Sequence, residues 1–272
     1  MTIMAQIECL ILWGHKQDEN SVMLGADMLK NYIKNKRYKK RTCPIKMRLV
    51  PYGSGWTDVY ADFGDGELYF VISDIMCDSF GSLMKALYCL YPENNDPGDM
   101  LCMNPHMMDS KLGAYEVIDG KRVLYKVADD INELGTDYYT EIPWKAWFCW
   151  DGEGTDSEWV LEREPNMDTS FLVKVHITQH DEIEKHYEYV VNYEDLCYAV
   201  ADACTEALKE HGIYGYHYSS QYHDMNLRYL LFLKSVALRN MDARELTSHR
   251  NENKGESTDF NKEIELLLFD MK

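Results

Sequence analysis

The sequence lacks the short motifs that usually identify a nucleotide site, a metal ribbon or a hydrolase nucleophile. It contains no GxxxxGK[ST] or GxGxxG loop, no GxSxG elbow, and no CxxC pair among its eight cysteines. These chemistries need glycines or cysteines at fixed short spacings. We therefore predict no catalytic residues, no cofactor and no metal from motifs.

Long hydrophobic runs are also missing. The apolar stretches at residues 9–13, 68–72 and 229–233 are far shorter than the roughly 20 residues that span a bilayer. Residues 1–13 have neither a basic start nor a small-residue cleavage site, so they do not resemble a signal peptide. We expect a cytoplasmic protein whose cysteines are free thiols acting as small hydrophobic residues.

The charge is strongly negative and unevenly distributed. The chain of 272 residues has a net charge of −18, yet residues 1–50 carry ten Lys/Arg and only four Asp/Glu. Residues 51–200 carry nine Lys/Arg and thirty Asp/Glu. Such a balance disfavours nonspecific binding to nucleic acid or anionic membranes and favours cationic partners. Pairing of the basic segment with the acidic middle of the chain is the alternative use of these charges.

Hydrophobic periodicity predicts an α+β protein in which antiparallel β-meanders are each followed by packing helices, with a helical C-terminal region. Period-two patterns predict strands over residues 6–13, 46–52, 56–63, 67–72, 115–118, 122–127, 145–150, 158–164, 171–177 and 186–191. Helical patterns with caps predict helices over residues 21–33, from 73 or 74 to 91, 192–211, 222–240 and 259–271.

Prolines and polar residues mark residues 93–113 as a surface loop and a boundary. We expect an N-terminal α+β half over 1–92, a C-terminal α+β half over 114–246, and a linker with a terminal helix over 247–272. All of these can also pack as one domain.

The two halves share a pattern at an offset of 120 residues, at which Tyr69 and Val71 fall on Tyr189 and Val191. Either a meander-plus-helix unit is duplicated, or two strand–helix units share an apolar phase.

The segment 144–159 concentrates tryptophan and carboxylate residues over two predicted strands and their turn. An aromatic sheet face with a carboxylate tip could bind a sugar, a cation or the basic surface of a partner, and paired carboxylates could also bind a divalent cation or act as acid and base. The other interpretation is structural, because tryptophan cross-strand pairs and Asp-Gly turns stabilise hairpins. The candidate binding residues are Trp147, Trp150, Asp151, Glu153, Asp156, Glu158 and Trp159.

Histidines and lysines supply two further candidates. His176, His180 and His186 surround a predicted strand–strand loop, where we expect solvated side chains and no metal site. Seven cations lie in residues 30–41 and could follow a phosphate backbone, or could balance a helix C-terminus and the acidic surface. The candidate nucleic-acid residues are Lys34, Lys36, Arg37, Lys39, Lys40 and Arg41.

Together these patterns favour a non-enzymatic binding protein with a basic protein as partner. In general character, an acidic α+β chain with aromatic-rich strands and no catalytic motif, it resembles bacterial immunity or inhibitor proteins that neutralise a basic toxin or nuclease. No motif carries that resemblance. The alternatives are a metal- or carboxylate-dependent hydrolase using residues near 151–186, and nucleic-acid or nucleotide binding through residues 34–41.

Overall fold

The computed structural model describes residues 42–73, 78–91, 108–118, 121–128, 130–134, 139–163, 171–219, 224–238, 249–251, 255–257 and 260–271. The strand expected over residues 6–13 and the helix expected over 21–33 lie outside the described residues.

Two antiparallel sheets form the framework. The first contains β1 (Lys46–Gly53), β2 (Trp56–Asp62) and β3 (Glu67–Ser73) in chain order. The second has six strands in the order β5-β4-β6-β7-β8-β9. Its strands are β4 (Met108–Ile118), β5 (Lys121–Ala128), β6 (Tyr139–Trp150), β7 (Ser157–Glu162), β8 (Leu172–Gln179) and β9 (Lys185–Asn192).

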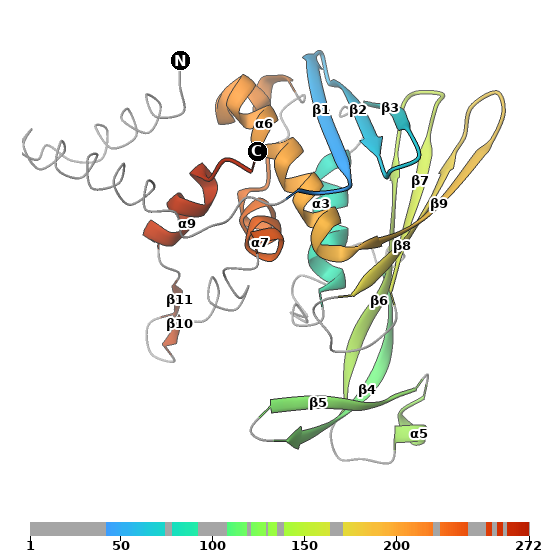
Figure 1. Cartoon of the computed structure of the whole chain (residues 1–272), viewed down its shortest axis with the longest axis vertical. Coiled ribbons are helices and arrows are strands. Elements are labelled where there is room, and N and C mark those ends of the chain that lie inside the picture. The colour runs from blue at the N-terminus through green and yellow to red at the C-terminus, as the bar shows by residue number, and fades with distance from the viewer. Residues whose placement is uncertain are drawn as a thin grey trace, which may run out of the picture.

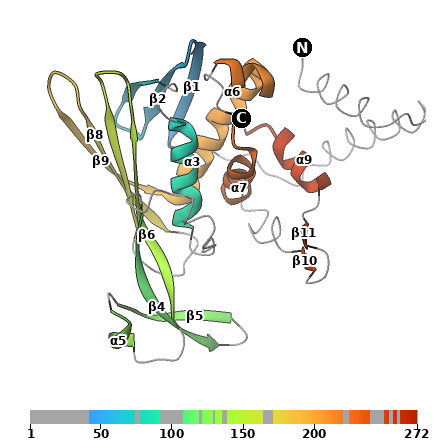
Figure 2. The same cartoon turned by 180° about the vertical axis from the view of Figure 1, so that it is seen from behind.

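Helices cover one side of the long sheet. The helices α3 (Ser79–Leu90), α6 (Tyr193–Ser219) and α7 (Leu227–Leu238) lie together on that side, and no described helix covers the opposite side of β7, β8 and β9 (Figure 1, Figure 2). The predicted α+β class, with meanders followed by packing helices and a helical C-terminal region, is confirmed. The remaining described elements are α5 (Ile131–Leu134), β10 (His249–Asn251), β11 (Gly255–Ser257) and α9 (Phe260–Leu268).

The two sheets share one hydrophobic core whose centre is aromatic. The rings of Trp150 and Trp159 lie 4.6 Å apart between centroids, and Phe70 of β3 lies 5.6 Å and 5.3 Å from them. Phe80 of α3 stacks on Trp150 at 6.3 Å. Since buried aromatic rings contribute large apolar areas and favourable edge and offset contacts, this cluster joins both sheets and a helix in one packed unit.

The helix boundaries follow from local capping. Asn192 accepts backbone hydrogen bonds from Glu194 (2.9 Å) and Asp195 (3.3 Å), so it caps α6 as predicted. Gly212, with φ of 73°, interrupts α6 at the position where the sequence predicts its end.

The predicted start of α3 was wrong. Asp78 caps this helix by accepting from the backbone N–H of Gly81, 2.8 Å away, and Ser73 belongs to β3. Ser73 stays in the sheet because it pairs with Trp56 and its N–H donates to the carbonyl of Asp151.

The strands of the long sheet extend further than expected. Residues 108–113, predicted as loop, belong to β4, and residues 139–144 belong to β6. The register shifts between Asp109 and Ser110, where β4 passes Pro143 and Trp144. Such a bulge accommodates Pro143, which has no N–H to donate to the neighbouring strand. A proline within an alternating hydrophobic pattern also argues against a strand, so the sequence did not predict this part of β6.

We predict that Trp150→Ala lowers the free energy of unfolding by about 3–5 kcal/mol, because it removes a fully buried ring from the joint between the sheets. Trp147→Ala is the matched control on the same strand, since that ring is only half-buried and faces outward. Urea unfolding followed by far-UV circular dichroism measures both. Equal losses in the two variants would contradict the packing described.

Candidate functional site

The turn between β6 and β7, residues 151–156, is held by a network of hydrogen bonds. The N–H of Ser73 donates to the carbonyl of Asp151 (2.7 Å), and its hydroxyl donates to Glu153 Oε1 (3.0 Å). Within the turn, the N–H of Glu153 donates to Asp151 Oδ1 (2.8 Å) and that of Gly152 to Asp156 Oδ1 (3.3 Å). The turn is therefore fixed both internally and to the end of β3.

Glycine at position 152 is required by close packing. A Cβ there would lie 2.7 Å from the carbonyl oxygen of Val71 and 2.6 Å from Thr155 Oγ1. Glu153 has a positive φ of 52°, and Gly154 follows with φ of 123°. Because non-glycine residues seldom adopt positive φ, the surrounding hydrogen bonds must hold Glu153 in place.

The turn between β8 and β9 lies beside the first turn. The N–H of His180 donates to the carbonyl of Asp156 (2.7 Å), which connects the two turns directly. The carboxylate of Glu184 lies between two histidines, 3.1 Å from His180 Nδ1 and 3.0 Å from His186 Nε2. Ile183, at the tip, is 74% exposed.

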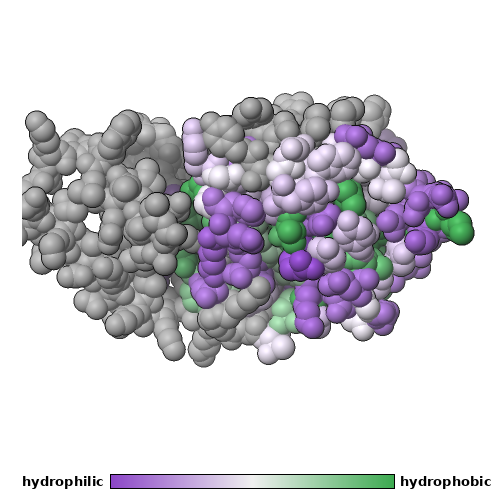
Figure 3. All heavy atoms as spheres, turned by 90° about the horizontal axis from the view of Figure 1, so that it is seen from above, coloured by the Kyte–Doolittle hydropathy of each residue, from purple (hydrophilic) through white to green (hydrophobic). Residues whose placement is uncertain are grey.

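We name residues 151–158 and 180–188 together the acidic end. They contain eight carboxylates and one lysine, and all the carboxylates are exposed except the half-buried Asp151. Figure 3 looks onto this end of the molecule and shows a mainly hydrophilic surface with isolated hydrophobic residues. This surface combines a high density of negative charge with turns that are held in one geometry.

A second surface, the tyrosine face, lies on the outward side of the three-stranded sheet and consists of Arg48, Tyr52, Asp58, Tyr60 and Tyr69. Tyr52 is 57% exposed and Tyr69 is 48% exposed. The guanidinium of Arg48 lies 3.8 Å from the ring centroid of Tyr60, whose centroid is 5.2 Å from that of Tyr69. Burial, together with the hydrogen bond that the hydroxyl donates to Asp58 (2.9 Å), raises the pKa of Tyr69 to about 12.

The tyrosine face adjoins the acidic end. The side-chain amide of Gln179, at the end of β8, donates to the backbone carbonyl of Tyr69 at 3.4 Å. Sequence reasoning missed these tyrosines. The available signal was their spacing, since alternate residues of a half-buried strand face the same side.

The tryptophans proposed as binding residues occupy different environments. Trp150 and Trp159 are fully buried, so their rings are part of the core and cannot contact a partner in this conformation. The indole N–H of Trp159 donates to Ser157 Oγ at 3.2 Å. Trp147 is half-buried on the outward side of β6, with the ammonium of Lys145 5.9 Å from its ring centroid.

The proposed carboxylates lie together on the acidic end. Glu153 and Asp156 are exposed in the turn, and Glu158 is exposed on the outward face of β7. Asp151 is half-buried beneath Ser73. The structure therefore keeps the carboxylates of the predicted site together and separates them from the two buried rings.

The described residues provide no metal site. No group of three or more His, Cys, Asp or Glu residues among them could hold a metal ion. His176 pairs instead with Glu188 at 3.1 Å across the strands. The basic candidates Lys34, Lys36, Arg37, Lys39, Lys40 and Arg41 lie outside the described residues.

The described cysteines include three buried thiols, Cys89, Cys197 and Cys204. Burial raises the pKa of Cys204, which keeps it protonated and unreactive. Its Sγ lies 3.8 Å from Met84 Sδ.

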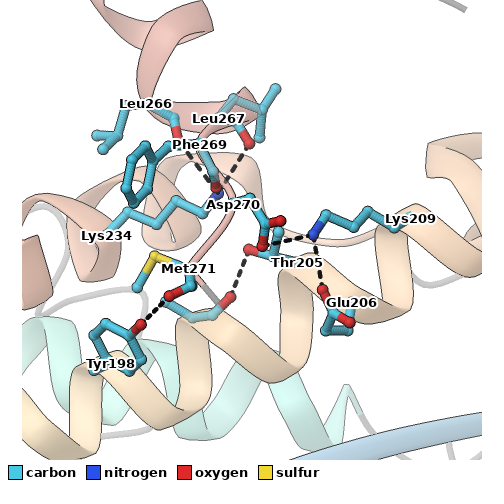
Figure 4. Close-up of polar contacts among 11 residues, drawn as sticks. Tyr198, Thr205, Glu206, Lys209, Lys234, Leu266, Leu267, Phe269, Asp270 and Met271 are labelled. Atoms are coloured by element: carbon cyan, nitrogen blue, oxygen red, sulfur yellow. Dashed lines mark hydrogen bonds and ion pairs between the residues drawn. The ribbon is translucent and has the colours of Figure 1, made fainter. Parts of the chain in front are cut away.

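A buried lysine is the centre of a polar cluster between α7, α9 and α6 (Figure 4). Lys234 of α7 is fully buried, and its ammonium donates to the carbonyls of Leu266 (3.2 Å), Leu267 (2.9 Å) and Phe269 (2.9 Å). These carbonyls lie at the C-terminal end of α9, where unpaired acceptors and the negative end of the helix dipole favour a cation.

The same cluster attaches the C-terminal segment to α6. The hydroxyl of Tyr198 donates to the carbonyl of Met271, and Lys209 pairs with both Glu206 (2.8 Å) and Asp270 (2.9 Å). Because the Nζ of Lys234 is enclosed and donates to three carbonyls at the end of α9, it ties α9 to α7.

Comparison with known proteins adds no relative: no family model, no curated protein and no solved structure matches the chain. None of the helices in the described part of the chain is long and apolar enough to cross a membrane. The candidate site therefore has to be interpreted from its own geometry.

The buried Lys234 predicts a pH dependence of stability. Burial lowers its pKa from 10.5 to about 7. Between those values the unfolded chain binds more protons than the folded chain, so this group makes the free energy of unfolding rise with pH, by at most about 1.4 kcal/mol per pH unit. Urea unfolding at pH 6.5 and pH 9.5 should show a larger rise for the native chain than for Lys234→Met.

The control is Lys174→Met, because that lysine is exposed on β8 and lies outside the cluster around Lys234. The free energy of unfolding of this control should rise between pH 6.5 and pH 9.5 as much as that of the native chain. If the free energy of unfolding changes equally for the native and Lys234→Met chains, the three carbonyls keep the ammonium charged in the folded protein. The lowered pKa assigned to Lys234 is then wrong.

Proposed function

We propose that this chain is a non-enzymatic, cytoplasmic binding protein of the inhibitor or immunity type, and that it binds a basic protein at the acidic end and the adjoining tyrosine face. The observation that carries the proposal is the fixed turn 151–156, which presents Glu153, Asp156 and neighbouring carboxylates in one geometry. A surface arranged before binding loses little conformational entropy on association.

Charge supports a basic partner. The acidic end holds eight carboxylates against Lys185, and the whole chain carries −18. The negative electrostatic potential of these charges raises the rate of encounter with a cationic protein and suppresses the binding of acidic proteins.

The tyrosine face supplies the aromatic contacts that the buried tryptophans do not. Tyrosine and arginine are enriched at the energetically important positions of protein interfaces. Tyr52 and Tyr69 expose about half of their surface, and the guanidinium of Arg48 is stacked on Tyr60. We therefore assign charge steering to the acidic end and apolar anchoring to these tyrosines.

We predict that Glu158→Lys/Glu182→Lys weakens capture of a basic partner by tenfold or more at 50 mM NaCl, because it reverses two exposed charges of the acidic end. The matched control is Glu133→Lys/Asp224→Lys, which makes the same change in net charge on exposed residues outside both surfaces. Immobilised native chain and both variants are incubated with the same lysate, and the bound proteins are identified by mass spectrometry.

Binding by the native chain and the control should fall steeply between 50 and 500 mM NaCl, since salt screens exposed charges. Recovery of no basic protein by the native chain would sink the proposal. So would equal losses in the two double variants, because they would indicate a response to net charge alone.

A further inference from the structure

The strand β1 has one edge that no described strand pairs. It lies at the end of the three-stranded sheet and pairs only with β2 among the described residues. An open edge presents a row of backbone N–H and C=O groups that can accept another strand. Along this edge runs a groove of about 710 Å³.

The lining of the groove indicates that the strand edge itself borders it. All six consecutive residues from Ile45 to Val50 line the groove, although alternate side chains of a strand point to opposite faces. Six residues of strand span about 20 Å. The groove is therefore long enough to take an extended segment of about six residues parallel or antiparallel to β1.

Helix α6 forms the opposite wall. Asp202, Glu206 and Glu210 follow one another at four-residue spacing and all line the groove. Both walls also contribute apolar residues, among them Met47 and Leu49 from β1 and Ala199 and Ala203 from α6.

The charges of the groove favour a basic occupant. Four carboxylates line it, the three on α6 and Glu67 of β3, against the two cations Lys46 and Arg48. Arg48 is stacked on the ring of Tyr60, and Glu206 is shared with Lys209. With Glu206 set aside, three carboxylates still face two cations, so the net charge of the lining is negative.

We propose that this groove binds an extended basic segment of a partner protein by strand addition to β1. In this mode the main chain of the ligand pairs with the open edge, and its alternate side chains select the sequence. The alternation that fits places lysine or arginine on the side of the sheet that faces α6 and its carboxylates, and apolar residues on the outward side, beside the ring of Tyr60. The site contains no residue of the acidic end, and it shares Arg48 and Tyr60 with the tyrosine face.

The test uses the full chain and a fluorescein-labelled, acetylated and amidated eight-residue peptide of alternating valine and lysine. Two further peptides carry backbone N-methyl groups on all valines or on all lysines. Since only one edge of an added strand faces β1, one methylated peptide should lose at least tenfold in affinity and the other should bind nearly as the parent. Fluorescence anisotropy measures each Kd.

Two variants separate this groove from the acidic end. Glu206→Gln/Glu210→Gln should weaken the parent peptide about threefold to tenfold, because it removes the half-buried and the exposed carboxylate charge of the wall. Glu158→Lys/Glu182→Lys should leave its Kd within twofold.

The inference is overturned if the parent peptide shows no binding at 1 mM, or if both methylated peptides bind as tightly as the parent. It is also overturned if the acidic-end variant weakens the peptide as much as the groove variant does. That last result would leave the proposed function standing, since it assigns the peptide to the acidic end.

Discussion

The packing of Trp150 and Trp159 against Phe70 is the interaction on which the rest of the structure depends. The two indoles come from neighbouring strands of the long sheet, and the phenyl ring comes from the last strand of the short one. Phe80 adds the first packing helix to the same cluster. These rings lie at the centre of the core that the two sheets and α3 share.

The aromatic cluster also fixes the surface above it. The turn 151–156 follows Trp150 directly, and the chain returns in β7 with Trp159, three residues after the turn ends. With both strands fixed by their buried rings, the turn meets the end of β3 and the turn after β8, and its carbonyls accept hydrogen bonds from the N–H groups of Ser73 and His180. The negative charge of this region is thus presented by a framework that core packing holds in place.

Much of the fold could be predicted from the sequence because its signals are local. The β2–β3 and β4–β5 hairpins, the cap at Asn192 and the interruption at Gly212 all follow from turn and cap chemistry within a few residues. The extension of β4 and β6 could not be predicted, because the pairing that accommodates Pro143 joins segments distant in sequence.

The composition of the candidate site could be predicted only in part. Aromatic residues occupy positions 147, 148 and 150, so alternation is compatible with either face of β6 pointing inward. The tertiary contact with Phe70 decides between them and places Trp150 in the core and Trp147 outside. Lys234 posed the same difficulty: one cation within an apolar helix is visible in the sequence, but the carbonyls it binds lie more than thirty residues away.

The acidic turns belong to the same cooperative unfolding unit as the aromatic core. Native-state amide hydrogen exchange tests it most directly at Ser73 and His180, whose N–H groups donate to the carbonyls of Asp151 and Asp156. Both amides should exchange with the same opening free energy as the amide of Trp159, through global unfolding. Fast exchange at Ser73 and His180 while Trp159 stays protected would contradict it.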